Sequence, residues 1–196
     1  MLFRSQGVSG TGKSTLGSAL AKMLDMPFLD GDDLHPKSNV EKMSSGHPLN
    51  DEDRLPWLEL IRTTAERMVV EMKVNSPTNV MSGIVVGCSA LKRYYRDILR
   101  GIIRPATKDQ QFPEVLQFAQ PKYLPTYFVF VNGSRETLVE RMEKRTDHFM
   151  KASMLDSQLT TLESPVGEEG VVVVSSNDTT NIQVMQALDG LRGFWL

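Results

Sequence analysis

Several features are scarce in this sequence, and each scarcity excludes a class of protein. The 196 residues contain a single cysteine, Cys88, so no internal disulfide can form and a reducing compartment is expected. No apolar run approaches the roughly 20 residues that cross a bilayer, and no signal-peptide pattern opens the chain. The net charge of −2 argues against general nucleic-acid binding, which favours basic domains. We therefore expect a cytoplasmic protein without membrane or nucleic-acid partners.

Two motifs of signalling GTPases are also missing. The sequence has neither a guanine-reading Asn-Lys-x-Asp nor a switch Asp-x-x-Gly. Its length suits one domain over residues 1–196 and is short for a motor or transporter ATPase. Among proteins that bind nucleotides, a small-molecule kinase is the leading class, with a non-catalytic nucleotide-binding module as its rival.

The most informative feature is a glycine-rich segment near the N-terminus that fits the phosphate-binding pattern G-x-x-x-x-G-K-[ST]. In such a loop the backbone N–H groups converge on one concavity, and the following helix adds its positive dipole end. Lys13 can reach the β- and γ-phosphate oxygens, and the Ser14 hydroxyl is suited to Mg²⁺. The pattern predicts that ATP is bound by Gly7, Val8, Ser9, Gly10, Thr11, Gly12, Lys13, Ser14 and Thr15.

Strand-like segments alternate with helical ones along the rest of the chain. This alternation predicts a three-layer α/β fold around a parallel sheet of about five strands. Beyond the strand before the loop, strands are expected at residues 27–29, 83–88, 127–131 and 171–174. Helices are expected at residues 14–24, 36–46, 53–74, 91–100 and 134–145, and a closing helix is marked by Ile182, Met185, Leu188 and Leu191. Residues 104–126 carry four prolines and weak periodicity, which indicates a surface loop or insertion.

The strand before the loop is the weakest part of this pattern. Residues 2–6 read Leu-Phe-Arg-Ser-Gln, whereas a central parallel strand is buried on both faces and is usually rich in Val, Ile and Leu. Two interpretations stay open: the strand is short and partly frayed, or the true start of the gene lies elsewhere.

The segment Asp30-Gly31-Asp32 carries the most information about chemistry. It follows the second expected strand, where a turn at Gly31 can direct both carboxylates to one site beside the phosphate loop. Phosphoryl transfer needs a carboxylate on the metal side and another that orients or deprotonates the attacking hydroxyl. We predict that Asp30, with Ser14, serves Mg²⁺ and that Asp32 serves the acceptor hydroxyl.

The residues around this segment resemble the gluconate kinases (gluconokinases), a shikimate-kinase-like branch of the nucleoside-monophosphate-kinase group. The resemblance covers most of residues 7–175 and rests on three blocks. These blocks are Phe28–Leu58 with its Leu-Asp-Gly-Asp-Asp-Leu-His-Pro run, Cys88–Arg100 with Cys-Ser-Ala-Leu-Lys, and His148–Pro165. Shikimate kinases carry a glycine triplet where this chain has Ser89-Ala90-Leu91, which weighs against that branch.

The resemblance implies a reaction and its cofactors. It implies transfer of the γ-phosphoryl group of ATP, with Mg²⁺, to the 6-hydroxyl of D-gluconate, in a catabolic step that feeds the pentose phosphate pathway. Members of the family often form homodimers. The alternatives are a kinase for shikimate or another sugar acid, and a catalytically impaired nucleotide-binding protein.

The resemblance also implies roles for individual residues. Arg54, Lys92 and Arg96 are candidates for contacts with the acid sugar; its carboxylate suits a planar bidentate cation, which favours Arg over Lys. Lys92 and Arg96 would equally fit an exposed basic helix face. His35 lies within the first block, where it could hydrogen-bond substrate or cap a turn. Arg141 and Arg145 are one helical turn apart. By resemblance they belong to the edge of a helical lid at about 141–165. The resemblance thus implies four catalytic residues: Lys13, Asp32, Arg141 and Arg145.

Overall fold

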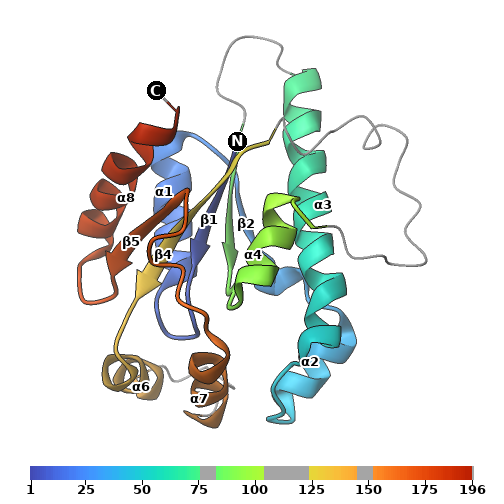
Figure 1. Cartoon of the computed structure of the whole chain (residues 1–196), viewed down its shortest axis with the longest axis vertical. Helices are drawn as coiled ribbons and strands as arrows, with labels where there is room; N and C mark the ends of the chain where they lie inside the picture. The colour runs from blue at the N-terminus through green and yellow to red at the C-terminus, as the bar shows by residue number, and fades with distance from the viewer. Residues whose placement is uncertain (76–82, 104–123, 145–151, 196) are drawn as a thin grey trace.

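The computed structural model describes residues 1–75, 83–103, 124–144 and 152–195. Its centre is a sheet of five strands in the order β2-β3-β1-β4-β5, in which every neighbouring pair is parallel. The strands are β1 (Leu2–Gln6), β2 (Phe28–Asp30), β3 (Ile84–Cys88), β4 (Thr126–Asn132) and β5 (Val171–Ser175). Their carboxyl ends all lie at one edge, close to the end of the molecule that carries α6 and α7 (Figure 1). This arrangement confirms the predicted fold class.

Helices cover both faces of the sheet (Figure 1). On one face α1 (Lys13–Leu24) and α8 (Thr180–Trp195) bury a core that includes Phe3, Leu16 and Leu191. On the other face α3 (Asp51–Asn75) and α4 (Arg93–Arg100) bury a core that includes Leu2 and Trp57. Leu2 and Phe3 enter opposite cores because successive side chains of a strand point to opposite faces. The result is the predicted three-layer architecture.

Shorter helices gather around the carboxyl edge of the sheet. They are the 3₁₀ turn η1 (Gly31–Leu34), α2 (Lys37–Ser44), α6 (Arg135–Glu143) and α7 (Ala152–Thr161). The Ser134 side chain accepts a hydrogen bond from the backbone N–H of Thr137, so this residue caps α6 as its sequence position predicts. None of the helices in the described part of the chain is long and apolar enough to cross a membrane.

The structure contradicts one of the two interpretations of the first strand, namely that it is short and partly frayed. β1 has five residues, all buried, and pairs with β3 on one side and β4 on the other. Two ladders of backbone hydrogen bonds therefore hold a segment whose side chains are poor strand formers. The polar side chains are buried with it, and the guanidinium nitrogens of Arg4 have no hydrogen-bond partner among the described residues.

One further expectation needed correction, and another was confirmed. The predicted insertion at 104–126 overlaps β4, which begins at Thr126, and Leu124 is already buried; residues 104–123 lie outside the described residues. On α8, Ile182 and Met185 are exposed, and the buried positions are Val184, Ala187 and Leu191. The closing helix was predicted correctly: of the four residues that marked it, Leu191 is buried and Leu188 packs partly buried against the core, whereas Ile182 and Met185 do not.

Candidate active site

The phosphate-binding loop joins β1 to α1 and is shaped by glycines. Gly10 and Gly12 have φ values of 82° and 90°, in the left-handed region that favours glycine. The Thr11 hydroxyl donates a 2.8 Å hydrogen bond to the Val8 carbonyl and so closes the turn from inside. α1 begins immediately after the loop, at Lys13. The loop therefore presents backbone N–H groups and a helix N-terminus to one site, as anion binding requires.

The acidic segment lies at the carboxyl end of β2, next to β3. A Cβ atom at Gly31 would lie 2.6 Å from the Gly87 carbonyl oxygen, so only glycine allows the two strands to approach this closely. The Asp30 carboxylate accepts the backbone N–H of Asp32 at 3.1 Å and caps η1. This turn carries Asp32 toward the phosphate loop, where its Oδ2 lies 3.6 Å from Lys13 Nζ.

A cavity of about 230 Å³ opens between the phosphate loop, η1, α3 and α7. It brings together five residues that the sequence predicted for the site: Ser9, Lys13, Asp32, His35 and Arg54. Apolar side chains close the rest of the wall, and Ser89, Met154 and Gln158 complete it. A cation, a carboxylate and an arginine around one small cavity can bind an anionic polyol and orient one of its hydroxyls.

His35 forms part of this wall in its neutral form. Its ring stacks on Trp57, with centroids 4.0 Å apart and planes inclined by 13°, and the Trp57 Nε1 donates to the Gly31 carbonyl at 2.7 Å. Burial lowers the pKa of His35 from 6.5 to about 4, and the charges of Arg54 and Lys13 act in the same direction, against that of Asp32. At neutral pH the ring is therefore uncharged and able to donate or accept a hydrogen bond.

Arg54 reaches the cavity from the first turn of α3, and a polar network stands behind it. Its guanidinium lies over the Tyr95 ring, 5.9 Å from the centroid. The Tyr95 hydroxyl donates to Asp51, whose two carboxylate oxygens also accept from Lys92 Nζ at 2.7 and 2.8 Å. The hydrogen bond from Lys92 is the main cause of a lowered pKa of Asp51. Lys92 is thus paired with Asp51 and does not line the cavity.

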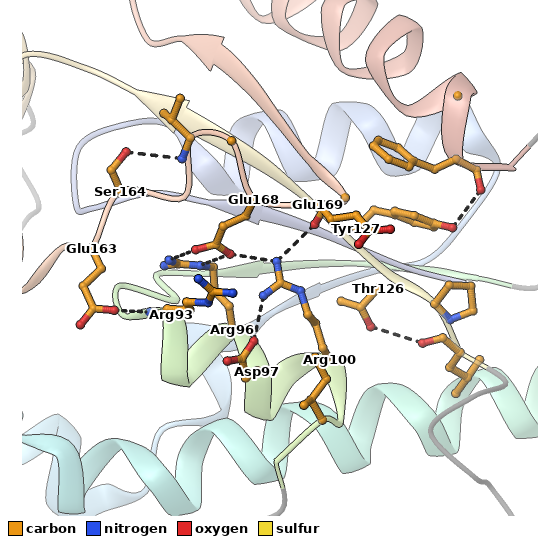
Figure 2. A pocket seen from close by; sticks show the side chains of 18 residues that line it. Arg93, Arg96, Asp97, Arg100, Thr126, Tyr127, Glu163, Ser164, Glu168 and Glu169 are labelled. Atoms are coloured by element: carbon orange, nitrogen blue, oxygen red, sulfur yellow. Dashed lines mark hydrogen bonds and ion pairs between the residues drawn. The ribbon is translucent and has the colours of Figure 1, made fainter.

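The structure corrects the expectation that Arg96 contacts substrate. Its side chain is fully buried, and Nη1 donates to the carbonyls of Ala90 and Leu91 at 3.1 and 3.2 Å. Figure 2 shows Arg96 and Arg100 of α4 converging on Glu168, which belongs to the segment before β5. Burial alone would raise the pKa of Glu168, but the hydrogen bonds from the two arginines outweigh it and lower the pKa. Arg96 therefore holds α4 against the segment before β5.

The ion pairs of Arg96 and Arg100 with Glu168 line a larger cavity of about 920 Å³ between α4, the start of β4 and the end of α8 (Figure 2). Its wall mixes arginines with acidic residues, and both Arg96 and Arg100 already have acidic partners. Neither the phosphate loop nor the acidic segment contributes to it.

Arg141 and Arg54 line different cavities beside the phosphate loop. The Arg141 guanidinium donates to the carbonyl of Thr11 at 3.5 Å and to that of Ser176 after β5. A third cavity, of about 490 Å³, is lined here by Gly10, Thr11, Gly12 and Thr15 of the loop, with Arg141 and the start of α8. An arginine beside the outer side of the loop fits the predicted role near the nucleotide. Arg145, its predicted companion, lies outside the described residues, as do His148 and part of the predicted lid.

Two residues at the site were not predicted from the sequence. Gln158 accepts the backbone N–H of Ser9 at 2.8 Å through its Oε1 and lines the smaller cavity. Asn39 donates from Nδ2 to the Asp53 carbonyl at 2.9 Å and contacts His35 Nδ1 at 3.4 Å. Both lie within the blocks that carried the resemblance, but an amide side chain alone does not indicate where it will point.

The residues near the loop fit a Mg²⁺ ion of the kind that kinases use. No group of three or more His, Cys, Asp or Glu side chains within the described ranges is arranged to hold a metal. Mg²⁺ in kinases needs no such cage, because one or two protein oxygens and the phosphates hold it. Ser14 in the first turn of α1 and Asp30 at the end of β2 are suitable ligands, directly or through water.

Comparison with known proteins connects this site to a family. A family model described as shikimate kinase matches residues 9–102. A probable gluconokinase of Schizosaccharomyces pombe is 41% identical over 170 residues, covering 87% of this chain and 76% of the relative. The gluconokinase of Gluconobacter oxydans is 43% identical over 169 residues, with 86% and 79% covered. A crystal structure of a gluconokinase from Sinorhizobium meliloti has a TM-score of 0.74 at 41% identity, covering 98% of this chain and 91% of that one.

Proposed function

This chain belongs to the gluconokinase family, and on that premise we propose that it transfers the γ-phosphoryl group of ATP to the 6-hydroxyl of D-gluconate. The observation that supports the proposal is that Lys13, Asp32 and Arg54 line one cavity, with Lys13 Nζ 3.6 Å from Asp32 Oδ2. These residues suit the two reactants: Lys13 suits the γ-phosphoryl group of ATP, Asp32 suits the acceptor hydroxyl, and Arg54 suits the gluconate carboxylate.

Binding follows from these charges. We place the triphosphate on the loop amides, with the nucleoside in the cavity beside Arg141 and the γ-phosphoryl group at Lys13. Arg54 is positioned to bind the gluconate carboxylate, because a guanidinium offers two parallel N–H groups to a carboxylate. Its place over Tyr95, behind which Asp51 pairs with Lys92, limits its side-chain freedom before substrate arrives. Neutral His35 can hydrogen-bond a sugar hydroxyl without adding a charge.

The chemical step then needs an oriented hydroxyl. Asp32 accepts a hydrogen bond from the 6-hydroxyl and takes its proton as the oxygen attacks the γ-phosphorus. The bond from that phosphorus to the β–γ bridging oxygen breaks, and ADP leaves with the electron pair. Lys13 stabilises charge on the transferring group. Mg²⁺, held by Ser14 and Asp30, would neutralise charge on the β- and γ-phosphates.

The test is ADP release measured with D-gluconate, with shikimate and without an acceptor. We expect release that depends on gluconate, and a product that a 6-phosphogluconate dehydrogenase oxidises. An Arg54→Met variant should raise the KM for gluconate more than the KM for ATP. Release that is equal with and without gluconate would contradict the proposed acceptor, and release with shikimate alone would indicate the neighbouring branch of the group.

A further inference from the structure

One side chain of α7 accepts a hydrogen bond from a backbone N–H group of the phosphate loop. Gln158 Oε1 accepts the N–H of Ser9 at 2.8 Å, although 149 residues separate the two in sequence. Ser9 is almost fully buried, and Gln158 is half-buried at the wall of the smaller cavity. A neutral amide oxygen thus accepts from the kind of donor that a phosphate loop offers to phosphate oxygens.

The position of Ser9 indicates which phosphate it serves. Gly10, Thr11 and Gly12 line the cavity beside Arg141, whereas Ser9 and Lys13 line the cavity with Asp32 and Arg54. In the binding mode proposed above, with the nucleoside in the first cavity, the triphosphate runs along the loop toward the second cavity. Its last phosphoryl group, the one that is transferred, therefore lies nearest the Ser9 amide. ADP ends one phosphate short of it.

We propose that Gln158 is a positioning residue: when ATP binds, its side chain gives up the hydrogen bond from Ser9 and forms one with the sugar acid instead. A phosphoryl oxygen is charged and accepts a hydrogen bond more strongly than a neutral amide does, so the γ-phosphoryl group displaces Gln158 from Ser9. The displaced carboxamide already lines the acceptor cavity and can bind a hydroxyl of the polyol there. ATP thereby prepares the acceptor cavity, and ADP does not. This inference rests on the proposed function for the identity of the acceptor.

Calorimetry of the full chain tests the exchange, with a non-hydrolysable ATP analogue and with ADP. Gln158→Leu removes the competitor for the Ser9 amide and should tighten the analogue on the order of two- to tenfold, the range of one neutral hydrogen bond. ADP affinity should stay within about twofold, because ADP does not reach that amide. In the wild type the analogue should tighten gluconate binding and ADP should not; Gln158→Leu should remove this difference.

Two further variants keep the test decisive. Gln158→Asn retains a carboxamide on a side chain one methylene shorter, which should no longer reach the Ser9 amide. It should therefore shift the affinities as Gln158→Leu does, and it provides the test if the leucine variant folds poorly. Thr160→Ala changes an exposed residue of the same helix and should leave both affinities unchanged. Equal shifts for the analogue and ADP, or no shift for either, would overturn the proposal. If the wild type does not use gluconate, the proposed function fails, yet the comparison of analogue with ADP still tests the contact between Gln158 and Ser9.

Discussion

Lys13 Nζ lies 3.6 Å from Asp32 Oδ2, which connects the phosphate loop to the acidic turn after β2. The Lys13 side chain is mostly buried, whereas that of Asp32 is half exposed. A pair of this kind contributes little to stability, because solvent screens it. Its importance is geometric: the cation that we propose for the γ-phosphoryl group and the carboxylate that we propose for the acceptor hydroxyl line the same small cavity.

Lys13→Met should abolish turnover while leaving the fold intact. Lys13 acts on charge that develops on the transferring group, and the loss of one such contact should reduce kcat by roughly 10²-fold or more. Initial rates and a melting curve measure the two effects. Lys22→Met, at an exposed lysine of the same helix, is the matched control and should keep normal activity. Near-normal activity of Lys13→Met would remove Lys13 from the mechanism.

The two aspartates should respond differently to replacement by asparagine. Asp32→Asn removes the base and should lower kcat by about 10²–10⁴-fold with little change in nucleotide affinity. Asp30→Asn keeps an oxygen that can accept the Asp32 amide, so the turn should survive; the variant should need more Mg²⁺ and recover part of its rate when Mg²⁺ is raised. Asp33→Asn, at an exposed residue of the same turn, serves as control. The opposite pattern would mean that the two roles are reversed.

The low pKa of His35 should make stability depend on pH. Burial holds that pKa at about 4, against 6.5 when the chain is unfolded. Between these values the unfolded chain binds more protons than the folded one, so His35 lowers the free energy of unfolding as pH falls from 6.5 toward 4. His35→Phe keeps an aromatic ring against Trp57 and should make this decline shallower. Urea titrations at several pH values measure it; identical slopes for the two proteins would contradict the assignment.

Arg96→Met should destabilise the protein without changing its use of substrate. Removal of one partner from a buried ion pair costs about 3–5 kcal/mol. Because Glu168 keeps its ion pair with Arg100, we expect a loss at or below the low end of that range. The loss from Arg96→Met combined with Glu168→Gln should be smaller than the sum of the two single losses, because both changes remove the same interaction. Denaturant titration gives the stabilities, and the KM for gluconate should be unchanged at temperatures where the variants are folded. A raised KM for gluconate at normal stability would mean that Arg96 contacts the substrate after all.

Arg4→Met should stabilise the protein. The Arg4 side chain is fully buried, and its burial lowers the pKa to about 9. Its guanidinium nitrogens have no hydrogen-bond partner among the described residues, and an unsatisfied buried polar group costs about 1–3 kcal/mol. Methionine fills similar space without that cost, so the melting temperature should rise while kcat stays the same. Arg4→Lys retains a buried charge and should give no such gain.

The sequence by itself determined the features that depend on local chemistry. A glycine-rich loop followed by a helix has a local geometry that suits phosphate, so the loop that begins at Gly7 and the helix that follows it could be predicted without tertiary information. The alternation of strands and helices sufficed for the parallel sheet. Ser134 was recognised as a helix cap for the same reason, because its hydrogen bond reaches only three residues ahead.

The tertiary structure decided everything that depends on which distant groups meet. Arg54, Lys92 and Arg96 look alike as basic residues on helices, but only Arg54 lines the cavity; Lys92 pairs with Asp51, and Arg96 pairs with Glu168, 72 residues away. Likewise the pairing of β1 with two neighbours overrode its poor strand propensity, and the contact of Gln158 with Ser9 spans most of the chain. Local pattern fixes the type of a side chain and its element, whereas its partner depends on long-range packing.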